Sequence, residues 1–194
     1  TISDFSTRTE FDAYTAYGTK DERFKFSVSG KTFVSKTSRQ ILEVGYKQDV
    51  EQLGQSVNAF RQDNILSSVF RRTPNTKLTL VEESKGSYQR EWFTGLDNTV
   101  QLRYRTLYPL GDLLYLKPSP AGEPPTVVNS IHTGEISLNT RFAYKEKYIS
   151  GDFARVSLGT SYPTVELHLA TGLPSFAKSE YGYQKVVAHV YQRL

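Results

Sequence analysis

The chain has 194 residues, contains neither cysteine nor methionine, and carries a formal net charge of +4 from 24 Lys and Arg against 20 Asp and Glu. The lack of cysteine excludes a disulfide framework, a thiolate nucleophile and a cysteine-ligated zinc site, and the near-balanced charge gives no argument for nucleic acid. No stretch approaches the ~20 apolar residues of a transmembrane helix, but transmembrane strands carry a much weaker signal. The missing initiator methionine predicts a processed chain or a piece of a longer one.

Side chains alternate with a period of two, which is typical of strands with two unlike faces. From Phe5 to Tyr17 one face is apolar and aromatic and the other is charged. Similar alternation follows over 23–34, 39–50, 135–144 and 185–194. Less regular strand candidates lie at 65–72, 76–83, 88–94, 99–106 and 164–171, so we expect about ten strands. Turn-like clusters predict connections at 18–21, 73–75, 84–87 and 95–98.

The longest break in the pattern runs from Tyr108 to Ser130 and includes a proline-rich stretch that cannot form a central strand. The same strand pattern resumes after it, so we expect a mobile loop within one β-region spanning 1–194 rather than a linker between domains. The region 145–163 is ambiguous, with 155–158 as a possible short extra strand.

Alternation alone does not separate a soluble barrel from a membrane barrel, because both show the same alternating pattern. The apolar face points inward in the soluble barrel and outward to lipid in the membrane barrel. Three features favour the membrane version. Several alternating segments are longer than the ~5–6 residues usual for soluble strands. The charged face carries both signs, as a ladder of ion pairs in a lumen would. Aromatic residues stand near the strand ends on the apolar face, where interfacial girdles fall.

Four stretches carry a family resemblance. The most specific is Tyr14 to Phe26, read as YTAYGTKDERFKF, and the others are 46–54, 135–149 and a block formed by 162–167, 172–173 and 183–186. They resemble a Bacteroidota outer-membrane barrel family of unknown function whose members carry an N-terminal carboxypeptidase-regulatory-like domain; the last block is similar, more loosely, to BamA/surface-antigen barrels. The resemblance implies a bacterial outer-membrane barrel, here incomplete at both ends, and supplies no catalytic residues.

Chemistry-bearing motifs are scarce. His168 and Glu166 share a predicted face, so an outer-membrane hydrolase is one alternative, although a hydrogen-bonded lumen histidine is the commoner reading. No metal-spaced histidine pair, nucleophile elbow, phosphate loop or calcium loop is present. We therefore expect no catalytic residues, no metal and no cofactor.

The sequence thus predicts an all-β fold: an antiparallel transmembrane β-barrel of the outer-membrane type, or a partial barrel of about ten strands. The expected function is a non-enzymatic role in outer-membrane transport, assembly or as a complex subunit in a Gram-negative bacterium. The expected partners are membrane lipid, lipopolysaccharide and other outer-membrane proteins or lipoproteins. A soluble ligand-binding β-barrel remains an alternative, and the loop 108–130 should be extracellular.

Two sets of residues follow from this prediction. The residues expected to face lipid are Phe11, Ala13, Phe26, Val28, Val44, Tyr46, Leu138, Phe142, Leu167 and Val190. The residues expected to face the lumen are Arg8, Glu10, Asp12, Lys25, Glu43, Lys47, Arg103, Glu135, Arg141, Glu166 and Lys185.

Overall fold

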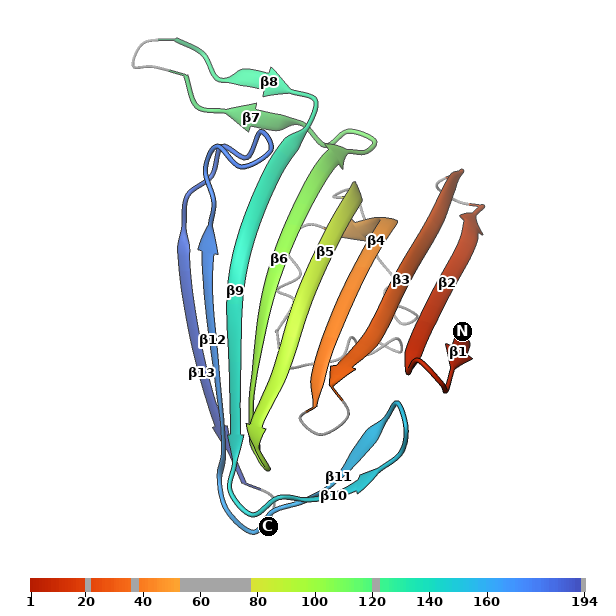
Figure 1. The fold of residues 1–194 in the computed structure, drawn as a ribbon. Coiled ribbons are helices and arrows are strands. Elements are labelled where there is room, and N and C mark those ends of the chain that lie inside the picture. Colours follow the sequence, from red (N-terminus) through yellow and green to blue (C-terminus); the bar gives the residue numbers. More distant parts are fainter. Residues whose placement is uncertain (20–21, 36–38, 53–77, 120–122, 193–194) are drawn as a thin grey trace.

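A single curved antiparallel sheet dominates the computed structural model of this chain (Figure 1). The structure describes residues 1–194 except 20–21, 36–38, 53–77, 120–122 and 193–194. Among these residues nine strands form the sheet in the order β1-β2-β3-β4-β5-β6-β9-β12-β13, so β1 and β13 are the edges of the described sheet, which is open. Two small hairpins, β7–β8 and β10–β11, stand apart from it. The all-β prediction, with its partial barrel, is confirmed.

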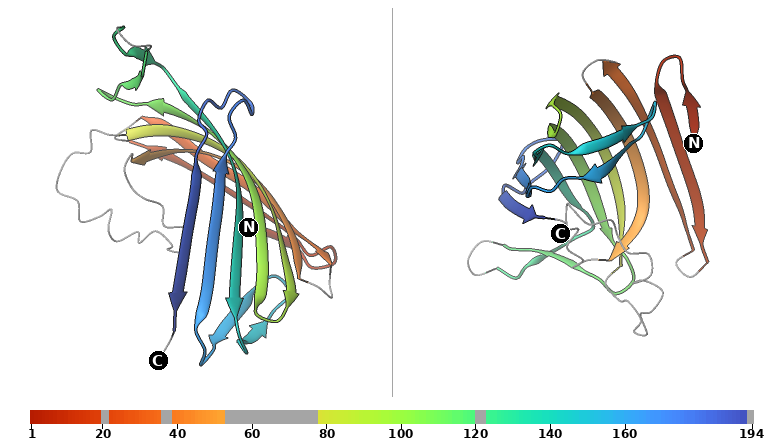
Figure 2. Two further views of the ribbon diagram at one scale, coloured as in Figure 1. Left: turned by 90° about the vertical axis from the view of Figure 1, so that its left-hand side faces the viewer. Right: turned by 90° about the horizontal axis from the view of Figure 1, so that it is seen from below.

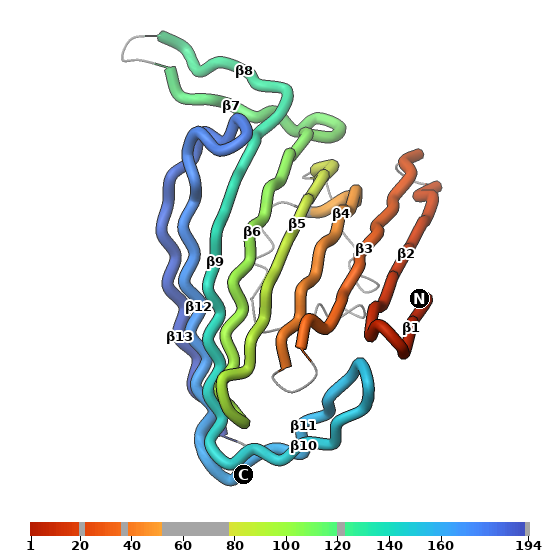
Figure 3. Tube along the Cα trace, viewed as in Figure 1, coloured from red at the N-terminus to blue at the C-terminus, as the bar shows by residue number. Residues whose placement is uncertain are grey.

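The strands of the main sheet are long. Their bounds are β1 Ile2–Asp4, β2 Thr9–Gly18, β3 Arg23–Ser35, β4 Gln40–Gln52, β5 Leu78–Phe93, β6 Leu96–Pro109, β9 Ile131–Ala143, β12 Thr164–Gly172 and β13 Gln184–Tyr191. The hairpin strands are β7 Tyr115–Lys117, β8 Thr126–Val128, β10 Lys147–Ser150 and β11 Arg155–Gly159. Figure 3 shows β3, β4, β5, β6 and β9 as extended tubes that run side by side.

Exposure alternates along several strands, of which β3 and β12 are the clearest, and the polar face is the less exposed one. In β12 Thr164, Glu166 and His168 are buried, whereas Val165 and Leu169 are exposed. The sheet curves, and hairpin β10–β11 crosses its concave side (Figure 2). Charged side chains of the sheet reach that hairpin, as the pair between Arg155 and Glu91 shows. The polar face is therefore concave, and the apolar face is convex.

The two hairpins mark opposite ends of the strands (Figure 1). Hairpin β7–β8 extends from the upper end, where Tyr115 is buried and its hydroxyl lies 2.9 Å from that of Thr79. Val81, one position further along the same face of β5, is 1% exposed. This packing gives the upper end of the concave face its core.

Three expectations about connections are corrected. Residues 84–87 form the middle of β5 and not a turn. Lys85, for example, lies opposite Gly45 of β4 and Arg103 of β6. The small residues of this stretch remain in the strand because both neighbouring strands pair with them. The connection expected at 95–98 is shorter, since β6 already begins at Leu96. The loop 108–130 contains the β7–β8 hairpin.

The short extra strand expected at 155–158 is confirmed and forms most of β11. The candidates at 65–72 and 73–75 lie outside the described residues. Among the residues that are described, no helix is long and apolar enough to cross a membrane.

Candidate functional site

The convex face collects all ten residues that the sequence assigned to lipid. Strand register places them together, because paired residues of adjacent strands point to the same side: Ala13 pairs with Val28, and Val28 with Tyr46. These side chains are largely uncovered, with Val28 50% exposed and Val190 63% exposed. The convex face is thus a broad apolar surface; what it contacts stays a prediction.

Two polar rows bound the apolar surface on its central strands. Each row consists of residues that pair across β4, β5, β6 and β9. The lower polar row is Gln40, Arg90, Asn98 and Thr140, and the upper polar row is Gln48, Glu82, Thr106 and His132. Between them lie three rows of mostly apolar or small side chains, of which the central one is Val44, Gly86, Leu102 and Ile136.

Aromatic rings stand at both polar rows. The Tyr88 hydroxyl donates to Gln40 Oε1 at 2.9 Å, and the Arg90 guanidinium stacks over the Trp92 ring at 4.1 Å. At the upper row the Tyr108 hydroxyl donates to Glu82 at 3.4 Å. Rings with one apolar side and one polar tip favour the boundary between lipid and water.

The apolar band shifts steadily across the sheet. On β3 it includes Phe24 and Phe26, at the level of the upper polar row and beyond, and gives way to Thr32. On β12 it includes Leu167 and Val165, at the level of the lower polar row and beyond, and gives way to Thr171. The band is therefore inclined to the rows of paired residues, rising towards β2 and falling towards β13.

The concave face collects the charged residues that the sequence assigned to a lumen. Ten of the eleven lie on this face of the strands by register, and Arg8 lies in the turn before β2. Opposite charges pair across neighbouring strands. The pairs are Lys31–Glu10 at 2.7 Å, Lys85–Glu43 at 2.6 Å, Arg105–Glu83 at 3.1 Å and Arg103–Glu135. Lys47 and Glu51 pair at 2.7 Å along β4 itself. The ladder of ion pairs expected from the mixed charges is present; whether it lines a lumen stays a prediction.

His168 and Glu166 share the concave face, but each binds other residues. His168 Nδ1 bonds to Asn139, which lies opposite it on β9. Glu166 Oε1 lies 3.4 Å from Arg141 Nε and accepts a hydrogen bond of 3.2 Å from the Tyr191 hydroxyl. The carboxylate of Glu166 is therefore engaged by a cation and a hydroxyl rather than by His168. In the described part of the chain no cluster of His, Asp and Glu could hold a metal ion.

Glu146 anchors the β10–β11 hairpin to the sheet. Arg141 donates to its two carboxylate oxygens at 2.6 and 2.8 Å, and the hydroxyls of Tyr148 and Ser157 donate to it as well. Burial favours the neutral acid, but the hydrogen bonds from Arg141, Ser157 and Tyr148 outweigh it and lower the pKa of Glu146 to about 2. The same surroundings raise the pKa of Tyr148 to about 12, through burial and its bond to Glu146.

The far end of the hairpin reaches the first strands. The Phe153 ring packs edge-on against Phe5 at 5.1 Å and against Phe33 at 6.4 Å, and Arg8 lies 3.8 Å from Asp152. The hairpin therefore spans the concave side from β9 to β3. The sequence missed this element's role: its contacts join residues far apart in the chain, and no local period records them.

Fold and faces together define a class: an all-β chain built on a large, curved, open antiparallel sheet with one apolar and one charged face. Residues 2–194 match the family described as "Family of unknown function (DUF5686) C-terminal domain", and the chain belongs to that family. Neither a curated protein nor a solved structure matches it. The expectation of a family of unknown function is confirmed; the bacterial group, the N-terminal domain and the likeness to BamA stay predictions.

Proposed function

We propose that this sheet is part of a β-barrel in the outer membrane of a Gram-negative bacterium, with its convex face on lipid and its concave face lining the lumen. The burial pattern supports this assignment. A soluble barrel hides its apolar face and shows its polar face to water, whereas here the exposed face is apolar and the enclosed face is charged.

The inclination of the apolar band is the observation that carries the proposal. From β2–β3 to β12–β13 the band shifts by about 3.5 rows of paired residues, and because successive rows on one face are two residues apart, this is about seven residues or about 23 Å at ~3.3 Å per residue. The same strands are six spacings of ~4.8 Å apart, or about 29 Å. The normal of a planar slab that crosses the sheet along this line makes an angle of about 40° with the strands, and the tilt expected of strands in outer-membrane barrels is roughly 35–45°.

The barrel must then be completed by strands other than those described. Within lipid, the unpaired N–H and C=O groups of a free edge cost several kcal/mol each. The edges at β13 and at β1–β2 would therefore pair with further strands, from the same protein or from another. This fits the family resemblance to Bacteroidota outer-membrane proteins, in which the barrel follows an N-terminal carboxypeptidase-regulatory-like domain.

The role that we assign is non-enzymatic: transport, assembly or membership of an outer-membrane complex, with lipid, lipopolysaccharide and other outer-membrane proteins or lipoproteins as partners. The engagement of Glu166 by Arg141 and of His168 by Asn139 supports this over a hydrolase. Hairpin β10–β11 crosses the concave face, which favours a closed or gated lumen over an open pore.

Adjacent residues in the middle of β3 provide a direct test. Val28 lies on the convex face, and Ser29 lies on the concave face opposite Asp12. Val28→Arg should prevent membrane assembly, since an arginine near the bilayer midplane costs ~2–4 kcal/mol. Ser29→Arg adds the same charge on the other side, beside a carboxylate, and should assemble normally. Both are read out as protein in the outer-membrane fraction of cells expressing the full-length protein, by heat-modifiable migration in gels.

The two rival outcomes are distinct. Normal folding of Val28→Arg together with a water-soluble wild-type protein would indicate the soluble ligand-binding barrel, because a half-exposed valine in water tolerates arginine. Failure of Ser29→Arg alone would mean that the faces are assigned the wrong way round.

A further inference from the structure

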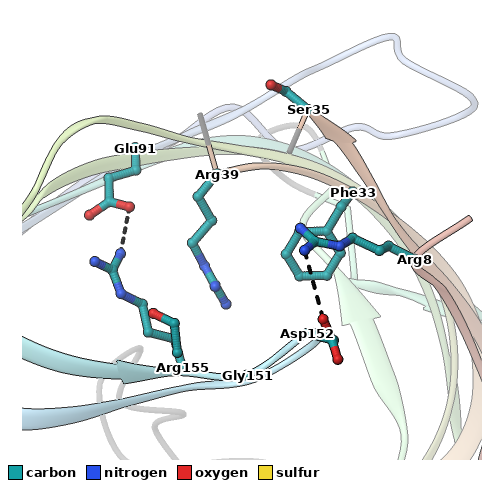
Figure 4. A pocket seen from close by; sticks show the side chains of 9 residues that line it. Arg8, Phe33, Ser35, Arg39, Glu91, Gly151, Asp152 and Arg155 are labelled. Carbon is teal, nitrogen blue, oxygen red and sulfur yellow. Dashed lines mark hydrogen bonds and ion pairs between the residues drawn. The ribbon is translucent and has the colours of Figure 1, made fainter. Parts of the chain in front are cut away.

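A cavity of about 460 Å³ lies between the tip of hairpin β10–β11 and the concave face of the sheet. Residues from five separate parts of the chain line it: the turn before β2, the end of β3, the turn into β4, the end of β5, and the hairpin (Figure 4). Its size lies within the ~300–1,000 Å³ typical of small-molecule sites.

The charged groups of the cavity do not balance. Three arginines, Arg8, Arg39 and Arg155, face two carboxylates, Glu91 and Asp152. Arg155 Nη1 lies 2.5 Å from Glu91 Oε2, and Arg8 Nη2 lies 3.8 Å from Asp152 Oδ1. These two pairs use both carboxylates, which leaves one positive charge on the third guanidinium.

Arg39 carries that charge. Its guanidinium points into the cavity between the two ion pairs (Figure 4), 5.4 Å from the centre of the Phe33 ring, and no carboxylate among the described residues lies within ion-pair distance of it. Burial and the nearby Arg155 lower the pKa of this partly buried arginine, and Glu91 and Asp97 offset only a part of that, so an anion in the cavity would favour the charged guanidinium.

A second donor is also unused. Arg155 Nε is buried and has no hydrogen-bond partner among the described residues, while its guanidinium stacks on the Tyr148 ring at 3.6 Å. Buried donors without acceptors are costly and uncommon, and they often mark a place where a ligand or ion supplies the acceptor.

From these observations we propose that the cavity binds a small organic carboxylate, held by a bidentate contact to the Arg39 guanidinium with its carbon skeleton against Phe33. The planar guanidinium fork matches the two oxygens of a carboxylate, and one negative charge neutralises the one in excess. The ligand would lie between hairpin and sheet, in contact with both. The proposal concerns the cavity alone and holds whether the convex face meets lipid or water.

The test uses 4-fluorobenzoate as the probe and the purified full-length protein in detergent or buffer. Fluorine NMR line broadening should report binding with a dissociation constant of about 1 mM, as expected for so small a ligand. Arg39→Gln should raise this constant at least about tenfold, because it removes the charge and the fork. Arg39→Lys keeps the charge without the fork and should give an intermediate value.

Lys85→Gln is the matched control, since it removes a cation of the same face that pairs with Glu43 outside the cavity. It should leave binding unchanged, and Trp92 fluorescence of each variant confirms that it is folded. The proposal is overturned if the wild type shows no binding up to about 10 mM, if Arg39→Gln binds as well as wild type, or if Lys85→Gln weakens binding equally. Tighter binding of inorganic phosphate than of fluorobenzoate would also overturn it, in favour of a phosphate site.

Discussion

The position of Gly95 tolerates no side chain larger than a hydrogen atom. It closes the connection between β5 and β6 with φ +96°, and a Cβ placed there would lie 2.1 Å from the carbonyl oxygen of Ala143. Backbone atoms cannot yield as a flexible side chain does, so Gly95→Ala combines a forbidden dihedral with a steric clash.

We expect Gly95→Ala to destabilise the sheet by at least about 2 kcal/mol, seen as a lower denaturant midpoint or a lower temperature of heat modification. Gly86→Ala provides the control: it lies mid-strand in β5, and a Cβ there meets nothing within 4 Å. That variant should be neutral or slightly stabilised. Equal losses in both variants would show that the φ of Gly95 is not what matters.

Glu146 gives the hairpin a dependence on acid. Its pKa is about 2 in the folded chain against 4.5 for an ordinary glutamate. Because the folded pKa is the lower one, its contribution of about 3 kcal/mol is complete above about pH 4.5 and declines as the pH falls towards 2. About half should be lost by pH 3.

Hydrogen exchange of 147–159, corrected for the intrinsic exchange rate, measures that loss. In the wild type protection of the hairpin should fall between pH 5 and pH 3, and Glu146→Gln should show low protection already at pH 7, since Arg141 then loses its carboxylate. If Glu146→Gln is as well protected as wild type at neutral pH, then Glu146 does not anchor the hairpin.

At the scale of the element, the tip of hairpin β10–β11 is attached to the first strands by the Phe153 ring and by the pair between Arg8 and Asp152. Phe153 packs against Phe5 and Phe33, so Phe153→Ala should release the tip from the first strands and increase hydrogen exchange in 149–156 about tenfold or more. Val156 lies on the same hairpin but is 60% exposed, and Val156→Ala should have little effect. A hairpin equally protected in both variants would contradict this account of how it is attached.

The strands differ in how much of them the sequence could predict. Strand β3 alternates cleanly, and its predicted range 23–34 nearly coincides with Arg23–Ser35. Strand β5 was split, because Ser84 to Ser87 has the composition of a turn; its strand geometry depends on pairing with both β4 and β6, which no local window contains.

The candidate sites differ in the same way. Both faces followed from alternation, because a period of two places whole sets of residues at once. The Glu146 cluster and the cavity around Arg39 depend on a hairpin that folds back over the sheet, and they join residues as distant as Glu91 and Arg155. Such contacts are set by tertiary packing, so nothing in the spacing of these residues indicated them.

At the scale of the whole molecule, the proposed membrane orientation predicts different depths in the bilayer for residues that strand register places in one row. Leu42, Leu138 and Val186 belong to one row of paired residues on the convex face, on β4, β9 and β13. If that row lay parallel to the membrane plane, the three side chains would have one depth. With strands tilted by about 40°, Leu138 should lie near the midplane, and the other two should be displaced by about 6–9 Å towards opposite surfaces.

Trp92 is the chain's single tryptophan, so a Trp92→Phe background permits a depth measurement with one reporter. Tryptophan placed in turn at Leu42, Leu138 and Val186 of the full-length protein in bilayers should be quenched by lipids brominated at known depths. Leu138→Trp should respond most to deep bromines, and Leu42→Trp and Val186→Trp to shallower ones. Equal depths for all three would refute the tilt and with it the main support for the membrane orientation, and the absence of quenching at all three would place the convex face outside lipid.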